Sequence, residues 1–216
     1  MPKIYLVHAV ALSMAPVEAS FRKIWPEARL AHLLDDSLFS DFNLDGRLTE
    51  AMIERFRQLG RYCAEAGADA ILFTCSAFGP AIDAVKAEQK FPVLKPNEAL
   101  YDELVARGGR VALLATFPPS LPSMRAEIEA QARQHGAQLE VHPHLVEGAL
   151  EALTGGNAEE HHRLIGEAMS GFADYDSIAF AQFSMAPAAV VAQALAGKPV
   201  LTTPDSAVHK LRSVMA

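Results

Sequence analysis

Three segments of the chain recur at one spacing of 107 residues, and this repeat is the feature that most constrains the fold. DAILFTCSAFGP at 69–80 aligns with DSIAFAQFSMAP at 176–187, with identical residues at four positions. At the same spacing KIYLV at 3–7 aligns with RVALL at 110–114, and FPVL near residue 91 aligns with KPVL near residue 198. General similarity between buried strands would not produce one common register, so we interpret the repeat as an internal duplication.

Each repeat alternates short apolar runs with longer helical patterns. The predicted strands cover 3–9, 29–34, 70–75, 91–94, 110–116, 138–142, 177–182 and 199–203. Helical periodicity covers 49–66, 120–135, 157–170 and 186–196. Continuous apolar strands joined by helices indicate parallel sheets covered on both faces. We therefore predict an α/β fold of two halves, each with a four-stranded parallel sheet.

The duplication also predicts where the halves meet in the chain. The first half is expected to comprise residues 1–96 together with 205–216, and the second half residues 97–204. The stretch LLDDSLFSDFNLDG at 33–46 is expected to be a long polar loop after the second strand, either a lid or a simple connection.

Charge and composition exclude several classes of function. The formal net charge is −7 and the basic residues are scattered, which argues against nucleic acid and anionic membranes as partners. No apolar run reaches the roughly 18–20 residues that span a bilayer, and the start MPKIYLVHAV lacks the pattern of a signal peptide. Only Cys63 and Cys75 are present, so no disulfide framework is expected and a cytoplasmic location is predicted.

Ligands of open α/β sheets bind beyond the carboxyl ends of the strands. The residues expected there are His8, Asp35, Cys75, Lys95, Thr116, His142, Gln182 and Thr203.

Cys75 is the most informative of these residues. It ends a strand and precedes a predicted helix, where the helix dipole and amide N–H groups are expected to lower the pKa of a thiol. Ser76 and Ala77 leave those amides open to a carboxylate. The alternative is a buried structural cysteine. Cys63 lies within a predicted helix and is expected to serve only in packing.

ADAILFTCSAFGP at 68–80 and RVALLATFPPS at 110–120, together with the length and the duplicated halves, resemble the aspartate/glutamate racemase superfamily. This superfamily includes glutamate racemase, hydantoin racemase, maleate isomerase and arylmalonate decarboxylase. The resemblance implies two pseudo-symmetric flavodoxin-like domains with an active site in the cleft between them. It also implies a cofactor-independent reaction on a small carboxylic or amino acid. Dimers are frequent in the family, so a homodimer remains open.

The resemblance extends to individual residues. Racemisation needs an acid/base group on each face of the substrate carbon, and the family uses two cysteines. Cys75 matches the first of them, and the turn after it matches the carboxylate-binding turn. Glu147 resembles an assisting acid. The hydroxyl-bearing loops that resemble substrate-binding loops contain Ser13, Thr116 and Ser120.

The chain departs from the family at the second cysteine, where QFS places Gln182, followed by Phe183 and Ser184. An amide cannot exchange a proton near neutral pH, so Gln182 and Ser184 are expected to be hydrogen-bond donors to the substrate. Racemisation then requires another group, His8 or Glu147, on the second face.

Three alternatives remain open. The first is a single-cysteine decarboxylase or cis–trans isomerase of the same fold, and the second is a non-catalytic protein that binds a small acid. For His8, a merely hydrogen-bonded histidine at a strand end is as reasonable as a catalytic one. A metal site is the weakest interpretation, and it would use His142 and His144 with either Glu147 or the pair His161 and His162.

Overall fold

The computed structural model describes all residues from Met1 to Ala216. The chain divides into two compact units, which are described separately. The first unit contains Met1–Ala99 and Ala207–Ala216, and the second contains Leu100–Ser206. No helix combines the length and the apolar character needed to cross a bilayer.

The first unit is a parallel sheet with the strand order β2-β1-β3-β4 and helices on both faces. Its elements are β1 (Lys3–His8), α1 (Met14–Ile24), β2 (Arg29–Leu34), α2 (Ser37–Asp45), α3 (Glu50–Glu65), β3 (Ala70–Phe73), α4 (Gly79–Glu88) and β4 (Val93–Leu94). Short 3-10 turns cover Ala11–Ser13 and Ser76–Phe78.

The second unit repeats this order as β6-β5-β7-β8, again with all strands parallel. Its elements are β5 (Gly109–Ala115), α6 (Ser120–His135), β6 (Leu139–Leu145), α7 (Ala149–Thr154), α8 (Ala158–Ala168), β7 (Ser177–Phe180), α9 (Ala189–Ala196) and β8 (Val200–Thr202), with 3-10 turns at Met169–Phe172 and Phe183–Ala188. The chain crosses between the units within α5 (Glu98–Arg107) and α10 (Thr203–Val214). The predicted α/β class with two four-stranded parallel sheets is confirmed.

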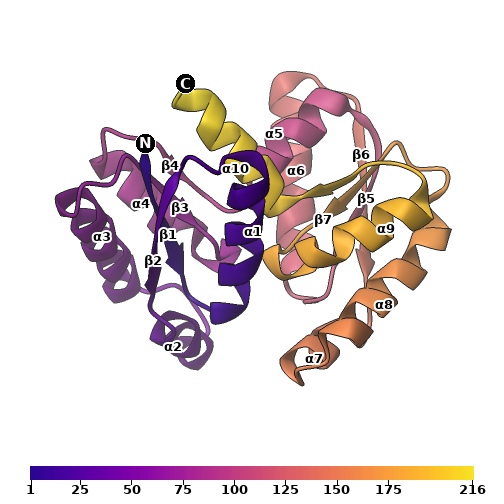
Figure 1. Cartoon of the computed structure of the whole chain (residues 1–216), viewed down its shortest axis with the longest axis horizontal. Helices are drawn as coiled ribbons and strands as arrows, with labels where there is room; N and C mark the ends of the chain where they lie inside the picture. The colour runs from indigo at the N-terminus through magenta and orange to yellow at the C-terminus, as the bar shows by residue number, and fades with distance from the viewer. The chain divides into compact units, whose positions relative to one another are not determined.

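The predicted polar loop at 33–46 is wrong, because most of it forms α2 (Figure 1). Leu38 is fully buried in the first core, and Phe39 and Phe42 pack against it. This apolar stripe stabilises a helix whose other residues are polar except for the exposed Leu44. Gly46, with φ of 65°, ends the helix in the left-handed conformation.

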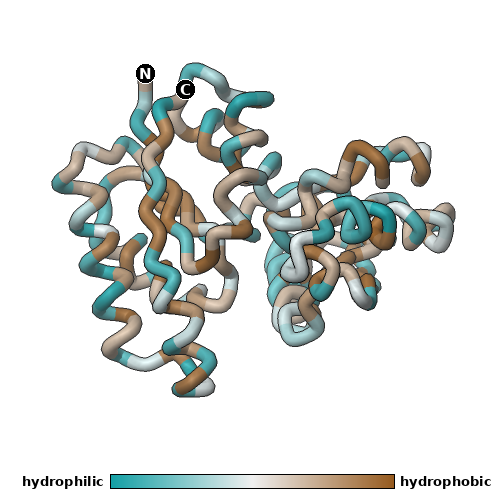
Figure 2. The backbone as a smooth tube through the Cα atoms, turned by 60° about the horizontal axis from the view of Figure 1, so that its bottom comes forward, coloured by the Kyte–Doolittle hydropathy of each residue, from teal (hydrophilic) through white to brown (hydrophobic).

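Alternating residues of the first sheet face two different sets of helices. Tyr5, Val7, Ile71 and Phe73 belong to a core cluster that also holds Phe56 and Cys63 of α3 and Ala81, Ile82 and Val85 of α4. Figure 1 shows α3 and α4 on one side of this sheet and α1 on the other. Figure 2 shows that the hydrophobic segments of the first unit concentrate in its sheet. The central strands β1 and β3 are almost entirely buried, whereas the edge strand β2 is only half-buried.

The second sheet is covered in the same way. Ala112, Leu114, Ile178 and Phe180 face a cluster that includes Ile165 of α8 and Ala192 of α9. Val111, Leu113, Ala115 and Ala179 face the opposite cluster, which includes Leu104 of α5 and Ile128 of α6.

One hydrogen-bond arrangement at the amino ends of the central strands occurs in both units. The Lys3 N–H donates to Asp69 Oδ2 at 2.7 Å, and the Asp69 N–H donates to the Lys3 carbonyl oxygen at 2.8 Å. Arg110 and Asp176 make the same two bonds at 2.7 and 2.9 Å. Each aspartate therefore fixes the start of one central strand against its neighbour. These are the residues that the 107-residue spacing aligns.

The packing of α3 on α4 yields a prediction about Gly60. A Cβ at this position would lie 2.5 Å from Cγ1 of the buried, β-branched Val85. Overpacking of this kind costs about 1–3 kcal/mol, which outweighs the helix-propensity gain of about 1 kcal/mol. We expect Gly60→Ala to lower the urea midpoint of the first unit, followed through the fluorescence of Trp25, the only tryptophan.

Gly79→Ala is the matched control, because a Cβ added there would meet no atom within 4 Å and the φ of −45° suits alanine. When Gly60→Ala is combined with Val85→Ala, the loss of stability in the double variant should be smaller than the sum of the losses in the two single variants. A Gly60→Ala protein as stable as the control would contradict this account of the packing.

Candidate functional site

The candidate site of the first unit lies where β1 and β3 end side by side. These two strands are parallel neighbours at the centre of the β2-β1-β3-β4 order, which is the topological switch point of such a sheet. His8 is the last residue of β1, and Thr74 and Cys75 follow β3 directly. The Thr74 N–H donates to the Val7 carbonyl oxygen at 3.0 Å and extends the pairing by one residue.

Cys75 is half-buried and packs against the core cluster that contains Phe73 and Phe78. Burial raises the pKa of the Cys75 thiol, and the hydrogen bond from the Ala77 N–H opposes this only in part. The expected lowering of the Cys75 pKa by a helix N-terminus is therefore wrong. The turn at Ser76–Phe78 has only three residues, and the loss of water around the sulfur outweighs its amide dipoles.

His8, Ser13 and Thr74 form a buried polar network at the same strand ends. His8 Nδ1 lies 2.9 Å from Ser13 Oγ and 2.9 Å from Thr74 Oγ1, and the two hydroxyl oxygens are 2.8 Å apart. The Ser13 hydroxyl also donates to the Val10 carbonyl oxygen at 2.9 Å. On its other side, His8 Nε2 lies 3.0 Å from Nδ1 of His32, which comes from the edge strand β2. The network ties three strands and the turn after β1 together.

The environment of His8 keeps its imidazole neutral. Burial, assisted by the charge of His32, lowers the pKa of His8 to about 4. His8 is fully buried and both of its ring nitrogens already have partners. Side chains of a strand alternate between faces, and Cys75 belongs to the face of Ile71 and Phe73, whereas Thr74 belongs to the other. This geometry favours a role for His8 in positioning the strand ends rather than in contacting a substrate.

The other predicted residues of the first unit are placed as follows. Ser76 and Ala77 are exposed directly after Cys75. Asp35 is paired with Arg55 at 2.6 Å. Burial raises the pKa of Asp35, but the hydrogen bonds from Ser37 and Arg55 outweigh it and leave the pKa lowered. Arg55 also binds Asp41 of α2 at 2.6 Å and thereby anchors that helix. Lys95 is paired with Asp83 at 2.9 Å.

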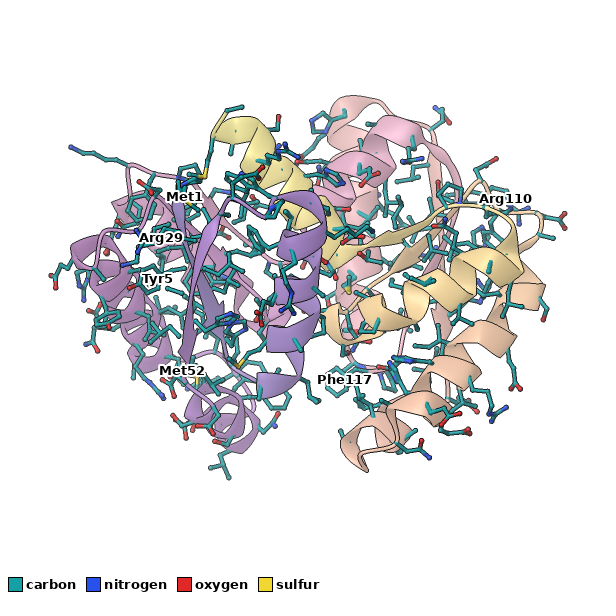
Figure 3. All side chains as sticks on the ribbon, in the orientation of Figure 1. Met1, Tyr5, Arg29, Met52, Arg110 and Phe117 are labelled. Atoms are coloured by element: carbon teal, nitrogen blue, oxygen red, sulfur yellow. The ribbon has the colours of Figure 1, made fainter.

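In the second unit, Thr116 and Gln182 meet at the ends of β5 and β7. The backbone N–H of Thr116 donates to Gln182 Oε1 at 2.7 Å, and the Thr116 hydroxyl donates to the same oxygen at 3.0 Å. Thr116 is buried and Gln182 is half-buried. Figure 3 labels Arg110 and Phe117, which lie near the start of β5 and just beyond its carboxyl end.

Ser120, Ser184 and Glu147 follow the ends of β5, β7 and β6 in the second unit. The Ser120 hydroxyl donates to the Phe117 carbonyl oxygen at 2.8 Å, as Ser13 does to Val10 in the first unit. Ser184 is half-buried in the turn after Gln182, and Glu147 is exposed beyond the end of β6.

Three of the four histidines in the metal hypothesis contact another group through one ring nitrogen each. His142 Nε2 lies 2.9 Å from Glu140, His144 Nε2 lies 3.1 Å from the Tyr175 hydroxyl, and His161 Nδ1 donates to the Ala149 carbonyl oxygen at 2.7 Å. No three His, Cys, Asp or Glu side chains come together in an arrangement that could hold a metal ion.

Thr74 and His32 are members of the first site that the sequence reasoning missed. In the sequence Thr74 looks like an ordinary strand residue, and only its position next to Cys75 indicates that it lies at the site. His32 interrupts the apolar run RLAHLL, and a polar residue within a strand is the only mark of its role.

Comparison with known proteins agrees with this arrangement. The sequence profile described as Asp/Glu/hydantoin racemase matches residues 45–174. The chain belongs to this family. A search of curated proteins finds no significant match.

Solved structures of racemase-family proteins share the fold. Allantoin racemase from Klebsiella pneumoniae superimposes with a TM-score of 0.74 at 17% identity, covering 100% of this chain and 88% of that one. An aspartate racemase homologue from Pyrococcus horikoshii gives 0.72 at 19% identity, with 99% of each chain covered. Unliganded arylmalonate decarboxylase gives 0.68 at 15% identity, covering 99% and 92%. At these identities the similarity shows the fold alone.

The low pKa of His8 predicts an acid-sensitive first unit. The pKa of His8 falls from 6.5 to about 4 on folding, so the unfolded chain takes up a proton at a higher pH than the folded protein does. The stability of the folded state is therefore greatest above pH 6.5 and decreases as the pH falls toward 4. We expect the free energy of unfolding to drop by about 2 kcal/mol between pH 7 and pH 5 from this group. Urea titrations followed by Trp25 fluorescence measure the change.

His8→Gln should be less stable at pH 7 but should show a flatter pH profile. His135→Gln, which replaces an exposed histidine of α6, should retain the full slope. A His8→Gln profile as steep as that of the unmodified protein would refute the assignment.

The two cysteines should differ in their reaction with iodoacetamide. Burial raises the pKa of Cys63 to about 12 and also raises that of Cys75 above 9.0. We therefore expect slow alkylation of Cys75 at pH 7, a rate that still increases beyond pH 9, and no alkylation of the fully buried Cys63 in the folded protein. Peptide mass spectrometry measures both sites, and a Cys75 rate that reaches its plateau near pH 7 would contradict the prediction.

Proposed function

We propose that this chain is a cofactor-independent enzyme of the racemase family in which Cys75 exchanges a proton with the carbon next to a carboxylate. The substrate is a small carboxylic or amino acid. The observation that supports this most directly is the position of Cys75. It is the one thiol at the carboxyl end of a central strand, and it is followed by the exposed residues Ser76 and Ala77, the turn that is proposed to receive the carboxylate.

The pKa of Cys75 indicates how this step would run. A raised pKa makes the S–H form the resting state, so the thiol is ready to donate. In that direction the S–H bond breaks, a C–H bond forms from the electron pair of the carbanion, and a thiolate remains. In the reverse direction the thiolate takes the proton from the carbon, and its high pKa makes it a strong base once it is formed.

The second unit supports a reaction with one proton-transferring group. Thr116, Ser120, Gln182 and Ser184 are proposed to bind the substrate, and none of these side chain types titrates near neutral pH. Glu147 is proposed to assist, and His8 is proposed to position the strand ends. Because the Gln182 amide cannot transfer a proton, we favour a single-cysteine decarboxylase or cis–trans isomerase over a symmetric racemase. A non-catalytic protein that binds small acids is the remaining alternative.

Proton exchange in deuterated water tests the proposal. The purified protein is incubated with aspartate, glutamate, malonic acids, maleic acid and hydantoin-type acids, and the α-carbon signals are followed by NMR. We expect incorporation of deuterium, or protonation of a decarboxylated product, without inversion at the carbon. Cys75→Ala should lose at least about 100-fold in rate, as is typical when an acid/base group is removed.

Cys63→Ala is the matched control, because Cys63 packs in α3 away from the strand ends and should not affect turnover. Exchange that persists in Cys75→Ala would refute the role of Cys75. Saturable binding of a panel member without any turnover would favour the binding protein.

A further inference from the structure

The bonds between Thr116 and Gln182 fix which way the Gln182 amide points. A backbone N–H can only donate, so the side-chain atom 2.7 Å from the Thr116 nitrogen must be the carbonyl oxygen of the amide. The Thr116 hydroxyl at 3.0 Å gives this oxygen its second donor. The acceptor capacity of the Gln182 oxygen is therefore used within the unit.

The NH2 group of Gln182 then points away from Thr116. It makes no hydrogen bond within the protein, and its nitrogen is not one of the fully buried polar atoms that lack a partner, so the NH2 group of the half-buried Gln182 keeps some exposure to solvent. What this strand end offers a ligand is a pair of N–H donors in a fixed direction. An amide pre-oriented in this way loses little conformational entropy when it binds.

The corresponding pair in the first unit is built differently. The 107-residue spacing aligns Thr116 with Ala9 and Gln182 with Cys75. Ala9 has no hydroxyl, and the only amide bonded to the Cys75 sulfur is that of Ala77. The unit with the Gln182 amide therefore has a hydroxyl, on Thr116, that orients the amide. The unit with the Cys75 thiol has no hydroxyl at the aligned position.

We infer that Thr116 is a positioning residue that holds Gln182 as a fixed hydrogen-bond donor to a ligand oxygen, a carboxylate or a carbonyl. The inference deepens the proposed function and rests on it for the identity of the ligand as a small acid. The Thr116 hydroxyl donates its hydrogen bond to Gln182, so it does not donate one to the ligand. Gln182 stabilises negative charge and moves no proton.

The test follows the NMR signals of the Gln182 NH2 group in ¹⁵N-labelled protein. These signals are assigned as the ones that disappear in the Gln182→Glu variant. Malonate and maleate are the probes. Gln182→Glu keeps an oxygen toward Thr116 but turns a negative charge outward, so we expect it to bind either acid at least about tenfold more weakly. In the unmodified protein the Gln182 pair should shift saturably with one of the probes.

Variants of Thr116 test the positioning role. Thr116→Val removes the hydroxyl and should weaken probe binding about threefold to tenfold and reduce the shift of the Gln182 pair. Thr116→Ser should restore both. Thr154→Val and Gln193→Glu repeat the same chemical changes at exposed positions of α7 and α9 and should bind like the unmodified protein.

Two results would overturn the inference, namely undiminished binding by Gln182→Glu and Gln182 signals that move with neither probe. If Cys75-dependent exchange is seen while the Gln182 signals stay fixed, the inference fails and the proposed function stands. If the Gln182 pair shifts saturably but no acid is turned over, the proposed function fails and the donor role stands.

Discussion

The pairing of two central parallel strands within each unit is the constraint on which the rest of the structure depends. β1 lies against β3, and β5 lies against β7, with helices covering both faces of each sheet. At the amino edge, one aspartate in each unit joins the two central strands through two hydrogen bonds, one made by its carboxylate and one by its backbone N–H. At the carboxyl edge, the same neighbours bring His8 to Thr74 and Thr116 to Gln182. The chemistry of each site therefore follows from a single strand register.

The two strand ends differ in what they can do with a proton. Cys75 is a titratable thiol whose pKa is raised by burial, whereas the amide of Gln182 does not ionise near neutral pH. At the strand ends of the first unit, His8, Ser13 and Thr74 form a buried polar network. In the second unit the position of Ser13 is kept as Ser120, but Ala115 and Ala181 stand where His8 and Thr74 would be. Buried polar groups are costly unless they are satisfied. The groups of this network are all hydrogen-bonded, and the network occurs only in the unit that contains Cys75.

The sequence predicted the elements whose signal is local. The apolar runs of β1, β3, β5 and β7 are continuous because these strands are buried on both faces, and such runs are visible without a structure. Helix α2 was missed because only Leu38, Phe39 and Phe42 mark its buried face among polar neighbours. The direction of the Cys75 pKa shift was also missed, because burial depends on side chains distant in sequence. The positions of Thr116 and Gln182 were predicted, but the bond between residues so far apart in sequence becomes visible only with the strand register. The domain boundaries and the shared cleft stay predictions.

The two aspartate anchors have a consequence for how such a protein can change over generations. They lie at the amino edge of each sheet, whereas Cys75 and Gln182 lie at the opposite edge. A substitution at a carboxyl end therefore leaves the bonds that align the central strands untouched. Selection can exchange a thiol for an amide, or an amide for a thiol, without altering the register of the sheet. The fold thus separates the residues that align its strands from those that set its chemistry. A substitution in one set therefore has little effect on the other set.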